Sequence, residues 1–183
     1  MKQFLFLLTL LSLMLPLHAL EEGEAAARFA NPDREGTYLL SKNVIGNGWV
    51  ILDFFATDCE GCIKELPELE ALHEEFGEAG LSVIVFAVDE EGADVVNPWF
   101  VENPTPLTVV LDRFKTTALR YGVEEIPAVF LVNPEGIIVL RQIAYAEENI
   151  AVIRKILSEA LGGEDEGGES KVPYPPETNM GGA

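Results

Sequence analysis

The sequence predicts an α/β domain in which a central mixed β-sheet is flanked by helices. Two continuous apolar runs, residues 49–56 and 81–88, have the length and composition of strands that are buried on both faces. Apolar residues then recur at three- and four-residue steps across residues 60–76, which predicts a helix directly after the first run. Two further runs flank the turn sequence Asn-Pro-Glu-Gly at residues 133–136, as in a β-hairpin. Strands that alternate with helices in this way are typical of α/β folds.

The remaining elements follow from the same patterns and from turn residues. The helix over residues 60–76 contains Pro67, which predicts a bend. A helix over residues 112–121 is expected to begin at an Asp112 cap and to end at Gly122. The other expected elements are a helical turn (25–29), a short strand (37–40), a short helix (93–101), a strand (107–111), the hairpin strands (129–132 and 137–143) and an amphipathic helix (147–161).

The two ends of the chain differ from this pattern. Lys2, an apolar stretch of about 14 residues and the small residue Ala19 together predict a cleaved secretory signal. The stretch is too short to span a bilayer comfortably, although an uncleaved anchor is the alternative. From Gly162 the composition changes to Gly, Glu and Pro, which predicts a disordered acidic tail. The expected organisation is a signal peptide (1–19), an N-terminal extension (20–40), the folded domain (41–161) and the tail (162–183).

The charge balance restricts the classes of partner. The chain has 12 Lys and Arg against 31 Asp and Glu, a formal net charge of −19. This charge argues against nucleic acid or an anionic membrane surface as a partner. A solvated acidic surface accounts for it, and basic partners are the alternative.

The two cysteines of the chain, Cys59 and Cys62, lie where the first buried strand ends and the helix begins. The first turn of a helix offers unpaired N–H groups and the positive end of its dipole, and both favour a thiolate. The thiolate is the nucleophile of disulfide exchange. Cys59 and Cys62 are therefore candidates for a redox-active disulfide.

A metal site, haem attachment and a structural staple are less favoured roles for this pair. A zinc site would need further ligands, which the chain lacks near the pair, so no metal is expected. Haem attachment needs a His after the second cysteine, and Ile63 is there. A purely structural disulfide would close a loop too small to stabilise the fold much. Asp53, alone in an apolar run, would be costly to bury unless it is protonated or paired.

In these features the chain resembles the thioredoxin superfamily. Asp53 stands six residues before Cys59, where thioredoxins carry a buried acid, and Pro67 stands where they bend the active-site helix. Ile126 and Pro127 match the segment that carries the thioredoxin cis-proline, and the 133–136 turn follows it. The resemblance covers about residues 45–158. It implies a thioredoxin-like fold, a proton relay through Asp53, and substrate binding at Ile126 and Pro127.

The segment from Cys62 to Pro67 resembles more narrowly the CxxCxxExP signature of TlpA-like (ResA-like) exported thiol–disulfide oxidoreductases. Glu65 matches their active-site glutamate, and the long segment before Pro127 fits their extra strand and helix. The sequence departs from the family at Asp58, where Trp is usual, and at Ala144, where Gly is expected.

The resemblance implies a reaction in which Cys59 attacks a substrate disulfide and Cys62 resolves the mixed disulfide, with Glu65 and Asp53 exchanging the proton. A carboxylate about 8 Å away, in a dielectric of about 40, costs a thiolate on the order of 1 kcal/mol. Because Asp53, Glu65 and the residues that flank Cys59 (Asp58 and Glu60) are acidic, we expect a reductase instead of a strong oxidase.

The expected partners are disulfide-containing exported proteins and a membrane thiol relay that donates electrons, with a periplasmic or otherwise exported location. The family also implies cytochrome c maturation or thiol repair as roles. We expect no cofactor, and we expect the protein to be a monomer. The alternatives are a disulfide oxidase or isomerase and a non-catalytic binding module. A peroxidase is disfavoured because Ala56 stands where a Thr would be expected.

Overall fold

The computed structural model describes residues 19–162, so the predicted signal peptide and acidic tail lie almost wholly outside the described residues. Among the described residues, no helix has the length and apolar content needed to cross a membrane. The elements are, in order, β1 (Ala30–Pro32), β2 (Tyr38–Leu40), the 3-10 helix η2 (Ser41–Asn43), β3 (Trp49–Phe55), α2 (Glu60–Phe76), β4 (Leu81–Ala87), α3 (Ala93–Glu102), β5 (Thr108–Leu111), α4 (Thr116–Tyr121), β6 (Ala128–Val132), β7 (Ile138–Ile143) and α5 (Glu147–Leu161).

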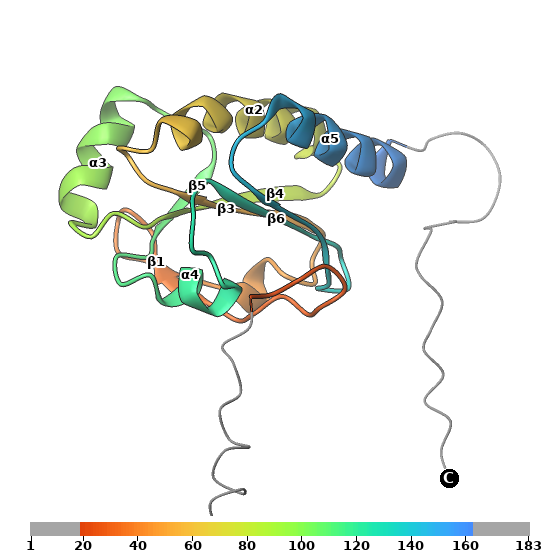
Figure 1. Ribbon diagram of the computed structural model, residues 1–183, viewed down its shortest axis with the longest axis horizontal. Helices are drawn as coiled ribbons and strands as arrows, with labels where there is room; N and C mark the ends of the chain where they lie inside the picture. The colour runs from red at the N-terminus through yellow and green to blue at the C-terminus, as the bar shows by residue number, and fades with distance from the viewer. Residues whose placement is uncertain (1–18, 163–183) are drawn as a thin grey trace, which may run out of the picture.

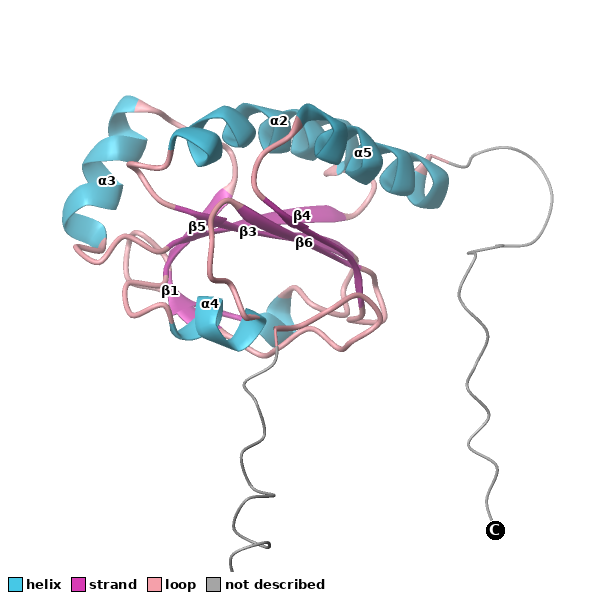
Figure 2. Ribbon diagram, in the orientation of Figure 1, coloured by secondary structure: helices cyan, strands magenta, loops and turns pink. Residues whose placement is uncertain are grey.

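The main sheet has five strands in the order β5-β4-β3-β6-β7 (Figure 2). Strand β4 runs parallel to β3 and β5, whereas β6 is antiparallel to both β3 and β7. The sheet is therefore mixed, as predicted, and β3 lies at its centre. The predicted extra strand is β5, which extends the edge next to β4 and is preceded by α3.

Helices α2 and α5 cover one face of the sheet, and α4 lies on the other (Figure 1). The central strand β3 is buried on both faces because its side chains alternate between the two layers. Val50, Leu52 and Phe54 belong to the core on the α4 side. Ile51 and Phe55 pack with the apolar residues of α2, so Asp53, at the alternate position between them, points to the same layer.

The N-terminal extension is part of the core on the α4 side. Phe29 is buried and meets Phe86 edge to face, with ring centroids 4.9 Å apart. The prediction of a helical turn at residues 25–29 is wrong: Ala25 instead forms a bridge with Ile137, and the Ala27 carbonyl accepts a hydrogen bond from Tyr121. The short apolar run there packs as an extended segment because the open face of the sheet offers it a surface.

Helix α4 begins at Thr116, four residues later than predicted, and its N-cap residue is Lys115, not Asp112. Asp112 still accepts hydrogen bonds from the first turn of the helix. The buried Asp112 carboxylate accepts hydrogen bonds from the backbone N–H groups of Thr117 and Ala118. It also accepts from the side chain of Asn31 in β1, whose own amide oxygen accepts from Thr117. This buried polar network joins the N-terminal extension to the loop that follows β5.

Replacing Asp112 by Ala should lower the free energy of unfolding by about 3 kcal/mol, because buried backbone donors and Asn31 lose their acceptor. The measurement is urea unfolding of both proteins with the m-value compared. The matched control is Asp94→Ala, an exposed acid in the first turn of α3 that makes no capping hydrogen bond. This variant should lose less than about 1 kcal/mol. Equal losses in the two variants would contradict the role of the network.

Candidate active site

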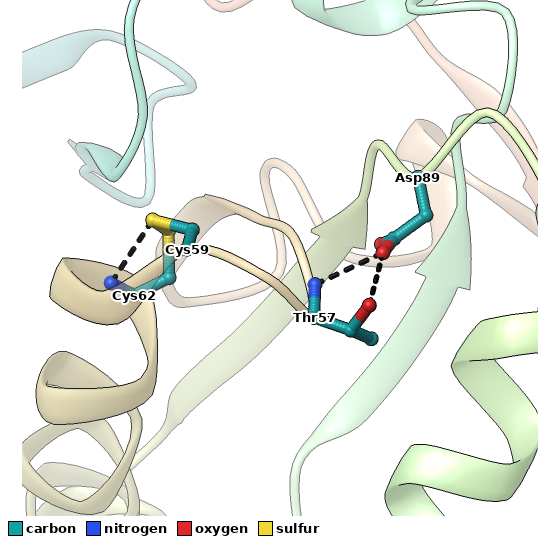
Figure 3. The surroundings of a disulfide bond; sticks show 4 residues. All are labelled: Thr57, Cys59, Cys62 and Asp89. Carbon is teal, nitrogen blue, oxygen red and sulfur yellow. Dashed lines mark hydrogen bonds between the residues drawn. A yellow bond between two sulfur atoms is a disulfide. The ribbon is translucent and has the colours of Figure 1, made fainter.

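Cys59 and Cys62 form a disulfide at the start of α2, with an S–S distance of 2.10 Å. Cys59 is the N-cap residue, and its sulfur accepts a hydrogen bond of 3.2 Å from the Cys62 backbone N–H (Figure 3). Cys62 is 1% exposed, whereas Cys59 is half-buried at the surface. Of the two cysteines, only Cys59 is therefore accessible: its thiol can attack a partner disulfide, and its sulfur can be attacked by a partner thiol.

The loop between β3 and Cys59 is held by Asp89, which follows β4. One Asp89 carboxylate oxygen accepts hydrogen bonds from both the backbone N–H and the hydroxyl of Thr57 (Figure 3). Nothing in the local sequence connects these two residues, which are 32 positions apart. The connection follows from the sheet, because β3 and β4 are parallel neighbours and their carboxyl ends meet at the same edge.

Two buried acids lie in the layer beneath the disulfide. Asp53, on β3, is 1% exposed, and Glu65, on α2, is 3% exposed. Glu65 follows Cys62 by three residues, so the two side chains lie on the same face of the helix, one turn apart. Among the described residues, Asp53 Oδ1 and Glu65 Oε2 have no hydrogen-bond partner. The expectation that Asp53 is buried is confirmed, and its role in proton transfer stays a prediction.

Burial favours the protonated form of both acids. Desolvation raises the pKa of Glu65 to about 7. Desolvation, together with the nearby negative charge of Glu65, also raises the pKa of Asp53 well above its ordinary value. At neutral pH the pair can therefore hold a proton next to the buried sulfur of Cys62.

The exposed acids near Cys59 have a different environment. Asp58 and Glu60 both lie at the surface. The side chain of Glu60 accepts a hydrogen bond of 2.7 Å from Lys64, which lowers the pKa of Glu60. Part of the negative charge predicted to oppose a Cys59 thiolate is therefore neutralised, and part is screened by solvent.

Pro127 completes the site from the neighbouring strand. The Ile126–Pro127 peptide bond is cis, as the resemblance implied, and Pro127 leads directly into β6. A Cβ atom built on Gly61 would lie 3.1 Å from Pro127 Cδ, so a glycine between the cysteines lets Pro127 pack closely against them. Ile126 is half-buried beside both cores. Its role and that of Pro127 in binding substrate stay predictions.

Two further residues, Ala144 and Tyr145, reach the site from the loop between β7 and α5. Ala144 has a left-handed backbone with φ of 66°, the conformation for which the family uses Gly. Its N–H donates to the Pro127 carbonyl, which ties this loop to the cis-proline segment. Tyr145 Cβ would lie 3.7 Å from a Cβ on Gly61. The departure of Ala144 from the family is visible in the sequence, but no pattern in the sequence places Tyr145 at the cysteines.

In the part of the chain that the structure describes, no group of three or more His, Cys, Asp or Glu residues is arranged to hold a metal ion. The groups that the site does present, two cysteines and two carboxyls, supply thiol and acid–base chemistry. A partly exposed cysteine, a buried cysteine and a proton-holding carboxyl pair are the groups that a thiol–disulfide exchange cycle requires.

Comparison with known proteins agrees with this geometry. The chain belongs to the AhpC/TSA family, whose pattern it matches over residues 23–141. It is 32% identical over 120 residues to the thiol-disulfide oxidoreductase ResA of Bacillus anthracis, a match that covers 64% of this chain and 66% of that protein. It is 31% identical to ResA of Bacillus subtilis (strain 168), with 66% of each chain covered. The matched region thus spans slightly less than two thirds of these relatives.

The fold has close counterparts among solved structures. A putative thiol:disulfide interchange protein DsbE from Chlorobium tepidum superposes with a TM-score of 0.73 at 24% identity, covering 79% of this chain and all of that one. A putative protein disulfide isomerase from Bacteroides thetaiotaomicron gives a TM-score of 0.72, also at 24% identity, covering 79% of this chain and 92% of that one. The predicted thioredoxin-like fold and the resemblance to ResA-like thiol–disulfide oxidoreductases are both confirmed.

Replacing Ala144 by Gly should raise the free energy of unfolding by about 0.5–1 kcal/mol. Relief of the left-handed strain should exceed the entropy that Gly adds to the unfolded chain. Denaturant unfolding measures the change. The control is Ala151→Gly, at an exposed position in α5, which should destabilise the protein by about 1 kcal/mol. Destabilisation by both variants would contradict the strain at Ala144.

Stability should fall as pH rises from about 4.5 to about 7. Over this range the folded state holds the Glu65 proton and the unfolded state releases it. Replacing Glu65 by Gln should therefore raise the free energy of unfolding at pH 8, by on the order of 3 kcal/mol, and change it little at pH 4. The measurement is denaturant unfolding of the oxidised protein across this range. Glu74→Gln, an exposed change on the same helix, is the control and should leave the profile unaltered. An unaltered profile in Glu65→Gln would contradict the raised pKa.

Proposed function

We propose that the chain is an exported thiol–disulfide oxidoreductase that reduces disulfides in extracytoplasmic proteins through Cys59 and Cys62. One observation carries the proposal: the disulfide joins a partly exposed sulfur to a buried one, on the same side of the sheet as two buried carboxyl groups whose pKa values burial raises. The names of the ResA relatives support the same class of reaction.

In the reductive half of the cycle, a donor thiolate attacks Cys59 Sγ, and the Cys59–Cys62 bond breaks. The electron pair of that bond goes to Cys62, which leaves as a thiolate. A thiolate at Cys62 is buried and cannot be stabilised by water, so it must be protonated. Glu65, one turn along the same face of α2, is the candidate proton donor, and Asp53 lies in the same layer. A second donor thiol then releases Cys59 from the mixed disulfide.

In the other half, Cys59 attacks a substrate disulfide and forms a mixed disulfide. Cys62 must now lose its proton to act as the resolving nucleophile, and the ionised Glu65 accepts it. The disulfide of Cys59 and Cys62 re-forms, and the substrate leaves with two thiols. A pKa near 7 suits both directions of this transfer at neutral pH.

The direction of exchange depends on how strongly the site favours the dithiol. Asp58 is exposed, and Glu60 is paired with Lys64, so each opposes a thiolate less than its charge suggests. The buried acids contribute more, since a proton held by Glu65 favours a neutral thiol at Cys62 over a stabilised thiolate. A weakly stabilised thiolate is typical of reductants, which supports the reducing role.

The proposed location and partners rest on the N-terminal segment and on the surface beside Cys59. The sequence pattern of residues 1–19 supports export, and an exported reductant needs a source of electrons, for which a membrane thiol relay is the natural class. Ile126 and the cis-Pro127 beside Cys59 would bind an extended disulfide-bearing segment of the substrate. Cytochrome c maturation and thiol repair are the roles proposed on the basis of the resemblance.

Replacing Cys62 by Ala should trap substrates as stable mixed disulfides with Cys59, because the resolving thiol is gone. Incubation with a disulfide-containing exported protein, followed by non-reducing electrophoresis, detects the adduct. The double variant Cys59→Ala/Cys62→Ala is the control and should form none. A binding module without thiol chemistry would keep its partners non-covalently in the wild type and in both variants, and this outcome would contradict the proposal.

The reduction potential of the Cys59–Cys62 couple decides the direction. Equilibration of the protein with dithiol buffers should give a value near that of thioredoxin, about −270 mV. A value near that of DsbA, about −120 mV, would reassign the protein as an oxidase or isomerase with the same two cysteines.

A further inference from the structure

The exclusion of water from Glu65 is a feature of the site that thiol chemistry by itself does not explain. Glu65 is 3% exposed, although it lies in the second turn of α2, close to the surface opening at Cys59. Leu66 and Leu69, on the core-facing side of α2, enclose it from within. The side of Glu65 toward Gly61 and the opening at Cys59 needs a cover from another element.

Tyr145 is placed to do this. Gly61, Glu65 and Glu68 lie along one stripe of α2, at steps of four and three residues. Tyr145 Cβ lies over Gly61, at 3.7 Å from where a Cβ would be, at the start of this stripe. Tyr145 is half-buried and packs against the core cluster that includes Cys62. Desolvation, followed by the negative charges of Glu147, Glu68 and Glu65, raises the pKa of Tyr145, which is consistent with a hydroxyl near this end of α2.

The backbone at Ala144, immediately before Tyr145, is strained. Ala144 adopts a left-handed conformation that is unfavourable for any residue with a side chain. It is fixed by hydrogen bonds on both sides: its N–H donates to the Pro127 carbonyl, and its carbonyl accepts from the Asn149 side chain. Strain that the surroundings maintain at a site is an observation from which a functional role can be inferred.

We propose that Tyr145 is a positioning residue of the redox site: its ring covers the Gly61–Glu65 side of α2 and keeps water from the Glu65 carboxyl. The cover makes Glu65 retain a proton for Cys62 instead of exchanging it freely with solvent. The catalytic meaning of the cover rests on the proposed function, whereas the cover itself can be tested without any turnover.

Charged and titratable groups surround Glu65 on each neighbouring element. Asp53 faces it from β3, Lys64 and Glu68 flank it on α2, and Glu147 begins α5 next to Tyr145. Removing the ring changes none of these charges, so a change in the titration of Glu65 would report access of water.

The direct test is titration of Glu65 by carboxyl ¹³C NMR in the oxidised full chain, with the signal assigned by its loss in Glu65→Gln. In Tyr145→Ala the pKa of Glu65 should fall from about 7 toward its ordinary value of 4.5. Tyr145→Phe keeps the ring and should leave the pKa near 7, and Tyr145→Leu, with a smaller cover, should lie between. Tyr38→Ala, which removes a tyrosine that is 62% exposed on β2, is the matched control and should change nothing.

A second measurement follows reduction of the Cys59–Cys62 disulfide by a donor dithiol as a function of pH, with each variant compared with the wild type. Tyr145→Ala should lose about tenfold or more in rate at pH 7 and recover as pH falls, because protonation of Glu65 is restored. Tyr145→Phe should retain the wild-type profile. A purely structural role for Tyr145 would lower the rate equally at every pH and would overturn the proposal.

The outcomes separate this inference from the proposed function. An unchanged pKa of Glu65 in a folded Tyr145→Ala protein would overturn the cover even if the protein reduces disulfides. A lowered pKa in a protein that reduces no disulfide would leave the cover standing and overturn the proposed function. Because Tyr145→Leu keeps part of the apolar contact, it provides the same test if Tyr145→Ala fails to fold.

Discussion

The burial of two carboxyl groups beneath a disulfide is the constraint on which this site depends. Asp53 comes from the central strand and Glu65 from the helix that carries the cysteines, and both are almost fully enclosed. Neither could be buried as a charge without a large loss of stability. Burial therefore raises the pKa of both groups and favours their protonated forms. The same burial destabilises the protein at higher pH, a cost that a purely structural pair of residues would not justify.

The rest of the fold holds this arrangement from several directions. The Thr57–Asp89 hydrogen bonds fix the loop before Cys59, and the cis-Pro127 segment packs against Gly61 from the neighbouring strand. The N-terminal extension fills the opposite face of the sheet and is joined to α4 through Asn31. The active site thus lies at one edge of the sheet, where the ends of β3 and β4 and the start of β6 converge (Figure 1).

The surface around Cys59 is acidic in sequence, but its charges are not equivalent in space. Glu60 is paired with Lys64, Asp58 is solvated, and burial favours the uncharged forms of Asp53 and Glu65. A sum over neighbouring carboxylates in the sequence therefore overstates the repulsion of a thiolate. The reducing role is better supported by the protonated state of the buried pair than by net charge.

Local periodicity and spacing along the chain were enough to predict the order of elements from β3 onward, the bounds of α2 and α5, and the place of the cysteines between strand and helix. They also indicated that Asp53 is buried, since a single acid in an apolar run is enclosed once that run becomes a central strand. The site roles expected of Glu65 and the prolines came instead from the resemblance to the thioredoxin superfamily. The features that depend on contact between distant segments appear only in the folded protein. Residues 25–29 extend along the sheet instead of coiling, Asp112 is joined to Asn31, Asp89 holds Thr57, and Tyr145 lies over Gly61. Each of these joins residues that lie apart in sequence, where the competing contacts of the folded chain outweigh local preference.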